Sequence, residues 1–269
     1  MGPIGLHGGG EYLAGDEPFL RLLLDAAAPP AEERARACGG PADDPRPGAI
    51  RIAIVPAAAA RQRPEVAGAH GVAAFRAIAA ARDRDVRAEV VPVVDRASAA
   101  DPRLAAALAG ADLIHLPGGD PDLVVAILDD TLAWRSMLAA RARGAVIAGA
   151  SAGAMALGEW TWTQAGGRPG LGIVRGLAVA PHFEGVAAAR WRAERAALGR
   201  HDLGILGLDE RTGVLSQPGA AGGGAAGGSA AWRVAGQGTA TWIGPHGAEP
   251  LVAGDGATIE LRGSALASA

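Results

Sequence analysis

The chain has 269 residues, of which 49% are hydrophobic and 20% are charged, and its net charge is −3 at pH 7. This composition is typical of a globular protein that folds around its own core without disulfides or structural metals, and it excludes a disordered chain. The sequence contains arginine but no lysine, which excludes a P-loop, a protein kinase and a Schiff-base enzyme. A mildly acidic charge with dispersed arginines also argues against a nucleic-acid partner.

The cysteine content and the absence of long apolar segments indicate the expected cellular location. Cys38 is the one cysteine and lies in a Gly/Pro-rich stretch that predicts a loop, so it forms neither an internal disulfide nor a multi-cysteine metal site. No basic segment precedes an apolar run near the start, so we expect no signal peptide. The uncharged stretches 144–158 and 212–232 are too short or too poor in large aliphatic side chains to span a bilayer. We therefore expect a cytoplasmic protein with no membrane partner.

Strand-like and helix-like segments alternate along the first half of the chain. Strands are predicted at 3–6, 50–55, 86–94, 112–116 and 145–148, and helices at 71–82, 102–108, 123–128 and 131–143. Asp120 is a predicted N-cap, with Pro121 at the first helical position. This order predicts the α/β class, with a mostly parallel central sheet and helices on both faces.

The last third of the chain has a different pattern. A long helix is predicted at 187–200, and strands at 177–180, 203–208, 231–234, 239–243 and 258–261. Residues 219–228 are almost pure Gly and Ala, which predicts a loop between strands and not a domain linker. We expect the late strands to extend or edge the same sheet, within one domain that covers residues 1–269.

The segment Gly149-Ala-Ser-Ala-Gly153 is the strongest local signal for chemistry. It follows a predicted strand and precedes a predicted helix, the context in which a sharp turn exposes a nucleophilic serine above a sheet. The amide of Ala152 would then lie at a helix N-terminus and could donate to an oxyanion. A tight turn in an alanine-rich protein is the alternative interpretation of the same residues.

A nucleophilic serine needs a base and an acid that orients the base. His182 follows a predicted strand, and ligands bind at such strand ends, which favours it over the other five histidines. Asp209 and Glu210 end another apolar strand, and the pattern alone does not choose between them. Gly118-Gly119 forms a second turn at a strand end, which could supply another oxyanion donor or be an ordinary βα turn.

Four of these segments together resemble a known family. Leu116-Pro-Gly-Gly-Asp120, Gly149-Ala-Ser-Ala-Gly-Ala154, Pro181-His-Phe183 and Gly207-Leu-Asp-Glu210 occur in the order and spacing of the cyanophycinase and dipeptidase E family of serine peptidases. The resemblance covers nearly the whole chain. It implies a flavodoxin-like fold similar to that of class I glutamine amidotransferases, with extra C-terminal β-strands.

The resemblance also implies roles for individual residues. Ser151 resembles the nucleophile, His182 the base and Glu210 the orienting acid, and Gly119 and Ala152 resemble the oxyanion donors. Asp120 and Arg190 are weaker candidates for substrate contact. Arg190, Arg192 and Arg195 could bind a substrate carboxylate, but a solvated helix face explains all three equally well. Pro121 stands where family members often have Gln, and the segment after Phe183 also departs from the family pattern.

The expected activity is hydrolysis of a small peptide or isopeptide bond, with an aspartyl bond as one candidate, through an acyl-enzyme and without a metal or organic cofactor. A homodimer is one of the expected assemblies. Two other functions stay open. An α/β-hydrolase esterase would use His7-Gly-Gly-Gly10 as its oxyanion motif, with Ser151, His246 and either Asp202 or Asp209. The other is a binding scaffold of the same fold without turnover.

Overall fold

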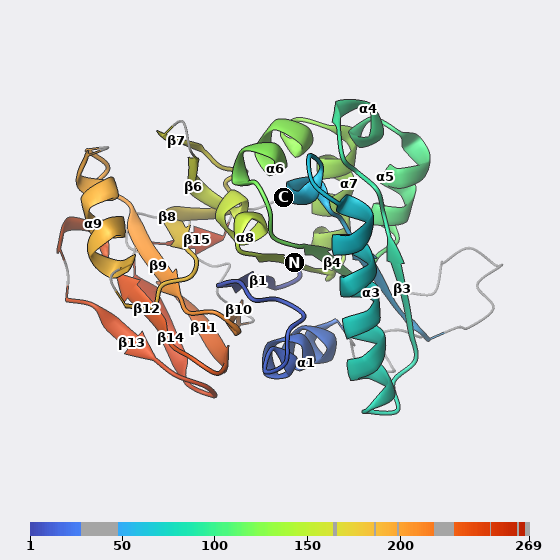
Figure 1. The fold of residues 1–269 in the computed structure, drawn as a ribbon, viewed down its shortest axis with the longest axis horizontal. Coiled ribbons are helices and arrows are strands. Elements are labelled where there is room, and N and C mark those ends of the chain that lie inside the picture. Colours follow the sequence, from blue (N-terminus) through green and yellow to red (C-terminus); the bar gives the residue numbers. More distant parts are fainter. Residues whose placement is uncertain are drawn as a thin grey trace.

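A computed structural model describes residues 1–27, 48–163, 166–185, 187–197, 199–217, 229–247, 249–262 and 264–266. Cys38 and the predicted loop at 219–228 lie outside these ranges, so the structure does not test either prediction. The ribbon has an α/β part that carries most of the helices and a second part built mainly from late strands (Figure 1).

The first sheet has eight strands in the order β14-β11-β10-β1-β5-β4-β2-β3. Its strands are β1 (Ile4–His7), β2 (Ile50–Ile54), β3 (Val86–Val90), β4 (Leu113–Leu116), β5 (Val146–Ala150), β10 (Thr212–Ser216), β11 (Ser229–Gly236) and β14 (Thr258–Arg262). The run from β3 to β1 is parallel, whereas β10, β11 and β14 pair antiparallel. The predicted class, with a parallel centre and extra C-terminal strands, is confirmed.

Helices cover both faces of this sheet, because successive strand residues point to opposite sides. The helices are α1 (Glu17–Ala26), α3 (Pro64–Ala80), α4 (Arg96–Ala99), α5 (Pro102–Ala109), α6 (Pro121–Leu128), α7 (Leu132–Ala142) and α8 (Ala152–Leu157), with a 3-10 turn η1 (Ala57–Ala59). Helices α1 and α3 share one hydrophobic cluster with Ile52 and Leu113, and α4 to α8 share the other with Ala53 and Ile114. Helix α3 begins at Pro64 and not at the predicted Gly71, because proline suits the first helical turn.

A second sheet was not predicted from the sequence. It runs β13-β12-β9-β8-β6-β7, with β15 paired to β8. Its strands are β6 (Gly158–Thr163), β7 (Gly166–Pro169), β8 (Val174–Ala180), β9 (Gly204–Leu208), β12 (Ala240–Ile243), β13 (Leu251–Ala253) and β15 (Ala265–Leu266). Helix α9 (Ala187–Ala197) and the 3-10 turn η2 (Pro245–Gly247) accompany it. The expectation that the late strands extend the first sheet is confirmed for 231–234 and 258–261, which belong to β11 and β14. It was wrong for 239–243, because β12 pairs with β9 of the second sheet.

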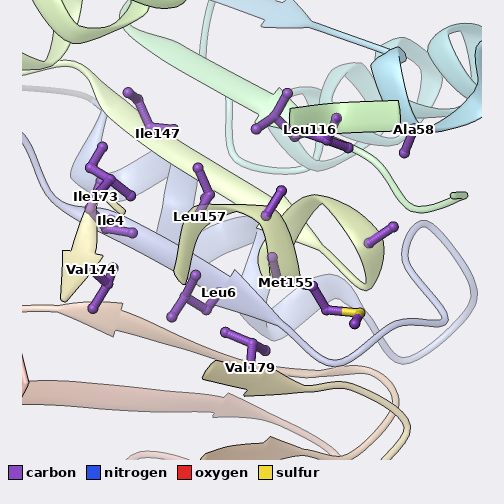
Figure 2. Packing of buried hydrophobic residues seen from close by; sticks show 14 of the residues in the cluster. Ile4, Leu6, Ala58, Leu116, Ile147, Met155, Leu157, Ile173, Val174 and Val179 are labelled. Atoms are coloured by element: carbon purple, nitrogen blue, oxygen red, sulfur yellow. The ribbon is translucent and has the colours of Figure 1, made fainter. Parts of the chain in front are cut away.

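One buried hydrophobic cluster joins the two sheets. It contains Ile4 and Leu6 of β1, Val179 of β8, and Met155 and Leu157 of α8. Figure 2 shows these side chains gathered between β1, α8 and β8. Contact between the sheets holds the ends of β5 and β8 in fixed positions, which matters for the residues that follow both strands.

Strand register brings several loops to one edge of the first sheet. His7 pairs with Ala150, and Leu116 pairs with Gly149. The residues after β1, β4 and β5 therefore emerge side by side at the carboxyl ends of parallel strands, where ligands bind in open α/β sheets. Among the helices of the described ranges, none is long and apolar enough to cross a membrane.

Candidate active site

Ser151 occupies a strained turn between β5 and α8. Its φ of 47° and ψ of −114° lie outside the usual regions for a residue with a side chain, as the sequence predicted for this turn. The turn closes because Gly153 has no side chain: a Cβ there would lie 2.2 Å from the carbonyl oxygen of Leu116. The strain therefore persists because packing against β4 maintains it.

His182 comes from the second sheet, in the residues that follow β8. Its backbone is also strained, with φ 50°, and its amide donates to the carbonyl oxygen of Gly8 at 2.9 Å. The ring Nε2 lies 3.1 Å from Ser151 Oγ, within hydrogen-bond reach. The two sheets thus bring together a hydroxyl and an imidazole in the geometry that proton transfer requires.

Glu210 completes this arrangement from the link between β9 and β10. Its Oε1 lies 2.8 Å from His182 Nδ1. The Oδ2 of the adjacent Asp209 instead accepts hydrogen bonds from the amide and hydroxyl of Thr239, each at 2.8 Å. The structure therefore brings Ser151, His182 and Glu210 into one chain of contacts and leaves Asp209 outside it.

The Gly118-Gly119 turn lies directly against the serine. A Cβ on Gly118 would be 3.2 Å from the Ser151 Cβ. The Gly118 amide donates to Glu11 Oε1 at 2.6 Å, so it is already engaged. No hydrogen bond between described residues uses the amide of Gly119 or that of Ala152. Within the described part of the chain, these two donors therefore have no protein acceptor.

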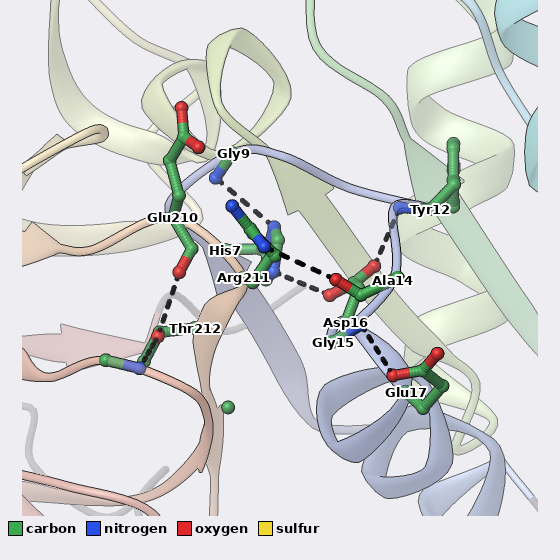
Figure 3. A network of polar contacts seen from close by, with 12 residues as sticks. His7, Gly9, Tyr12, Ala14, Gly15, Asp16, Glu17, Glu210, Arg211 and Thr212 are labelled. Atoms are coloured by element: carbon green, nitrogen blue, oxygen red, sulfur yellow. Dashed lines mark hydrogen bonds and ion pairs between the residues drawn. The ribbon is translucent and has the colours of Figure 1, made fainter.

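A glycine loop, Gly8–Gly10, underlies the whole site and was missed as a positioning element. Three consecutive carbonyl oxygens of the chain accept from the three site segments: His7 from Ser151 N at 2.9 Å, Gly8 from His182 N at 2.9 Å, and Gly9 from Arg211 N at 2.7 Å. Figure 3 shows Gly9 of this loop near both His7 and Glu210. The run His7-Gly-Gly-Gly-Glu11 directly after a strand was the sequence signal that could have identified it.

Two of the weaker candidates have structural partners. Asp120 caps α6 and accepts from the amide of Asp122 at 3.0 Å. Arg195 was expected on a solvated face or at a carboxylate, but it is buried and donates to the carbonyls of Leu203 and Gly244. Arg190 is exposed, and its guanidinium lies 5.5 Å from the Trp191 ring centroid.

The imidazole beside Ser151 is His182 and not His246, which the esterase alternative requires. Of its two candidate acids, Asp209 bonds to Thr239, and Asp202 pairs with Arg200 at 2.9 Å. The amide of Gly8 donates to the carbonyl of Thr212, and the amide of Gly9 donates to His7 Nδ1. Because these amides are engaged inside the protein, the glycine loop does not present them to a substrate.

A buried polar network lies beneath the glycine loop. Burial and the neighbouring His7 lower the pKa of His115 to about 3, and the hydroxyl of Tyr12 lies 2.7 Å from His115 Nδ1. Burial also raises the pKa of Tyr12 well above its ordinary value. Both groups are therefore neutral at pH 7, which is the cheaper state for a buried titratable side chain.

Known proteins resemble this chain in sequence and in fold. The family model described as Peptidase family S51 matches residues 48–221. The crystal structure of a peptidase from an acI-B1 Actinobacterium superposes with a TM-score of 0.70 at 24% identity, covering 97% of each chain. A putative peptidase E protein from Listeria monocytogenes EGD-e gives a TM-score of 0.49 at 13% identity, covering 80% of this chain and 94% of its own. No curated protein matched the chain.

Proposed function

Because this chain belongs to peptidase family S51, we propose that it is a serine peptidase in which Ser151, His182 and Glu210 form the catalytic triad. The observation that carries the proposal is the continuous chain of contacts, 3.1 Å from Ser151 Oγ to His182 Nε2 and 2.8 Å from His182 Nδ1 to Glu210 Oε1. Such a chain activates a hydroxyl that is otherwise a weak nucleophile.

The proposed reaction proceeds through an acyl-enzyme. Ser151 Oγ attacks the carbonyl carbon of the scissile amide while His182 Nε2 accepts the hydroxyl proton. His182 then gives that proton to the leaving amine, and the C–N bond breaks. Water, deprotonated by His182, then attacks the ester carbonyl carbon. The bond from that carbon to Ser151 Oγ breaks, His182 returns the proton to Oγ, and the acid product leaves. Glu210 holds the imidazole in the tautomer whose Nε2 accepts the proton.

The amides of Gly119 and Ala152 are the proposed oxyanion donors. Two features support them: the Gly118-Gly119 turn packs against Ser151, and neither amide has an acceptor among the described residues. Each such donor contributes on the order of 10²-fold or more to turnover, because it stabilises charge that develops only in the transition state.

The proposed substrate is a small peptide or isopeptide. Arg190 is the side chain that we propose contacts a substrate carboxylate, since it is exposed on α9. Asp120 is a weaker candidate because its carboxylate already caps α6. Aspartyl and β-aspartyl dipeptides, assayed beside simple esters, are the substrates that test this class.

The test of the proposed nucleophile is Ser151→Ala. We expect turnover of the best substrate to fall by a factor on the order of 10⁴ or more, with an unchanged melting temperature. A fluorophosphonate should label the wild-type protein at Ser151, located by peptide mapping, and should leave the variant unlabelled. Undiminished turnover by Ser151→Ala would overturn the proposal. Ser98→Ala, on α4, is the matched control and should keep full activity.

A further inference from the structure

His7 is a buried histidine for which the proposed reaction has no use. It is the last residue of β1, its side chain is 1% exposed, and its ring stacks on Phe19 with centroids 5.0 Å apart. The ring Nε2 lies 2.8 Å from Oδ1 of Asp16, which is also 1% exposed. Figure 3 shows this pair next to the glycine loop. Two buried polar side chains in contact are costly to place, so a specific role is expected of them.

The other ring nitrogen of His7 contacts the loop that touches the proposed base. The amide of Gly9 donates to His7 Nδ1 at 3.3 Å. Gly9 has φ +112°, and a Cβ on it would lie 2.3 Å from Cε1 of His182. Its carbonyl oxygen accepts from the amide of Arg211, the residue after Glu210, at 2.7 Å. The position of Gly9 therefore governs both the imidazole and the segment that carries the acid.

The contact with Gly9 indicates which nitrogen of His7 carries the ring proton. Because Nδ1 accepts from Gly9, the ring proton lies on Nε2, which is in close contact with the Asp16 carboxylate although the two are not aligned as a hydrogen bond. The second oxygen of Asp16 accepts from the amide of Tyr12 at 2.8 Å, so this carboxylate is itself fixed in place. Asp16, His7 and the Gly9 amide thus form a series of carboxylate, imidazole and donor, as Glu210, His182 and the Ser151 hydroxyl do.

We propose that His7 is a positioning residue for the reaction: held in place by its stacking on Phe19 and its contact with Asp16, it accepts from the amide of Gly9, fixes Gly9 against the ring of His182 and so aligns that ring with Ser151. This inference rests on the proposed triad. A misplacement of about 1 Å at a reacting group can lower turnover on the order of 10²-fold. Supporting side chains of this kind are typically worth about 10- to 100-fold.

The test compares His7→Phe with His7→Asn. Phe preserves the ring and its stacking on Phe19 but removes the acceptor, whereas the Oδ1 of Asn can replace Nδ1 as the acceptor for Gly9. We expect His7→Phe to lower kcat about 10- to 100-fold with KM within about twofold, and His7→Asn to recover most of that loss. The low-field proton resonance of His182 Nδ1–H should weaken in the Phe variant and persist in the Asn variant. His70→Asn, on the exposed side of α3, is the control.

Several outcomes would overturn the inference. They are a wild-type kcat in His7→Phe, an equal loss in both variants, or a change in KM alone. If His7→Phe does not fold, Asp16→Asn takes its place, because one oxygen of the amide cannot serve both Nε2 and the Tyr12 amide. It should lower kcat as His7→Phe would, and a wild-type kcat contradicts the inference. If the proposed triad is wrong, Ser151→Ala will retain turnover, which is a different result from any of those above. The His182 resonance would in that case still report whether His7 positions the His182 ring.

Discussion

Asp209 and Glu210 are adjacent carboxylates with different partners. Glu210 Oε1 lies 2.8 Å from His182 Nδ1, and Asp209 Oδ2 accepts from Thr239. The alternation of side chains at a strand end predicts that only one of the two faces the histidine, and the family resemblance selected Glu210. The supporting residues Glu11 and Glu184 could not be predicted, because they act by accepting the amides of Gly118 and Glu210 from distant positions in the sequence.

We predict a ranking of two neutral substitutions at these positions. Glu210→Gln should lower turnover by up to about 10⁴, because the imidazole is no longer held in the productive tautomer. Asp209→Asn should stay within a few-fold of wild type, since its amide oxygen can still accept from Thr239. Steady-state kinetics of both variants on one substrate decide the matter. If Asp209→Asn lowers turnover more than Glu210→Gln does, Asp209 and not Glu210 is the orienting acid.

Among the elements, the turn from β5 through Ser151 into α8 was the most predictable. The glycines at 149 and 153 are local requirements of the turn, so a short segment of sequence reveals it. The pairing of the late strands was not predictable in the same way. Segments 239–243 and 258–261 both have the pattern of short strands, yet β12 pairs with β9 and β14 pairs with β11. Strand partners are set by tertiary contacts that no local pattern encodes.

A methyl group added inside this turn tests the packing of the element. Gly153→Ala should destabilise the protein by about 1–3 kcal/mol, because the new Cβ would lie 2.2 Å from the Leu116 carbonyl and a backbone atom cannot rotate away. Gly254→Ala is the matched control, since no atom lies within 4 Å of a Cβ there. Denaturant unfolding of both variants measures the difference. Equal free energies of unfolding for the two variants would show that the turn can accommodate a methyl group at position 153, contrary to this structure.

The whole molecule is organised around the contact between its two sheets. Ser151 follows a strand of the first sheet, His182 follows a strand of the second, and Glu210 lies on the link between them. Sequence reasoning favoured Ser151 and His182 because each stands at a strand end, and the family resemblance selected Glu210, but neither revealed that the residues come from different sheets. Side chains from β1, α8 and β8 fill the space between, so the stability of this core and the geometry of the site depend on each other.

Acid should destabilise the whole molecule through His115. Its pKa is about 3 in the folded protein and close to 6.5 when unfolded, so between these values the unfolded chain binds more protons. The stability contributed by the neutral ring is complete above pH 6.5 and declines as the pH falls, by up to about 1.4 kcal/mol per pH unit. We predict that the free energy of unfolding falls more steeply from pH 7 to pH 4 in the wild type than in His115→Gln. Parallel pH profiles from denaturant titrations would contradict this assignment.

Strand β1 also has a consequence for biosynthesis. Among the described residues, its partners are β5 at 146–150 and β10 at 212–216, which both follow it by more than a hundred residues. Because a chain emerges from the ribosome with its N-terminus first, β1 and the loop after it wait without these partners until they have been translated. A nascent chain that has exposed Ser151 still lacks Glu210, the proposed orienting acid. The proposed triad therefore assembles only after the segment before β10 has emerged, and a product that ends before Glu210 cannot form it.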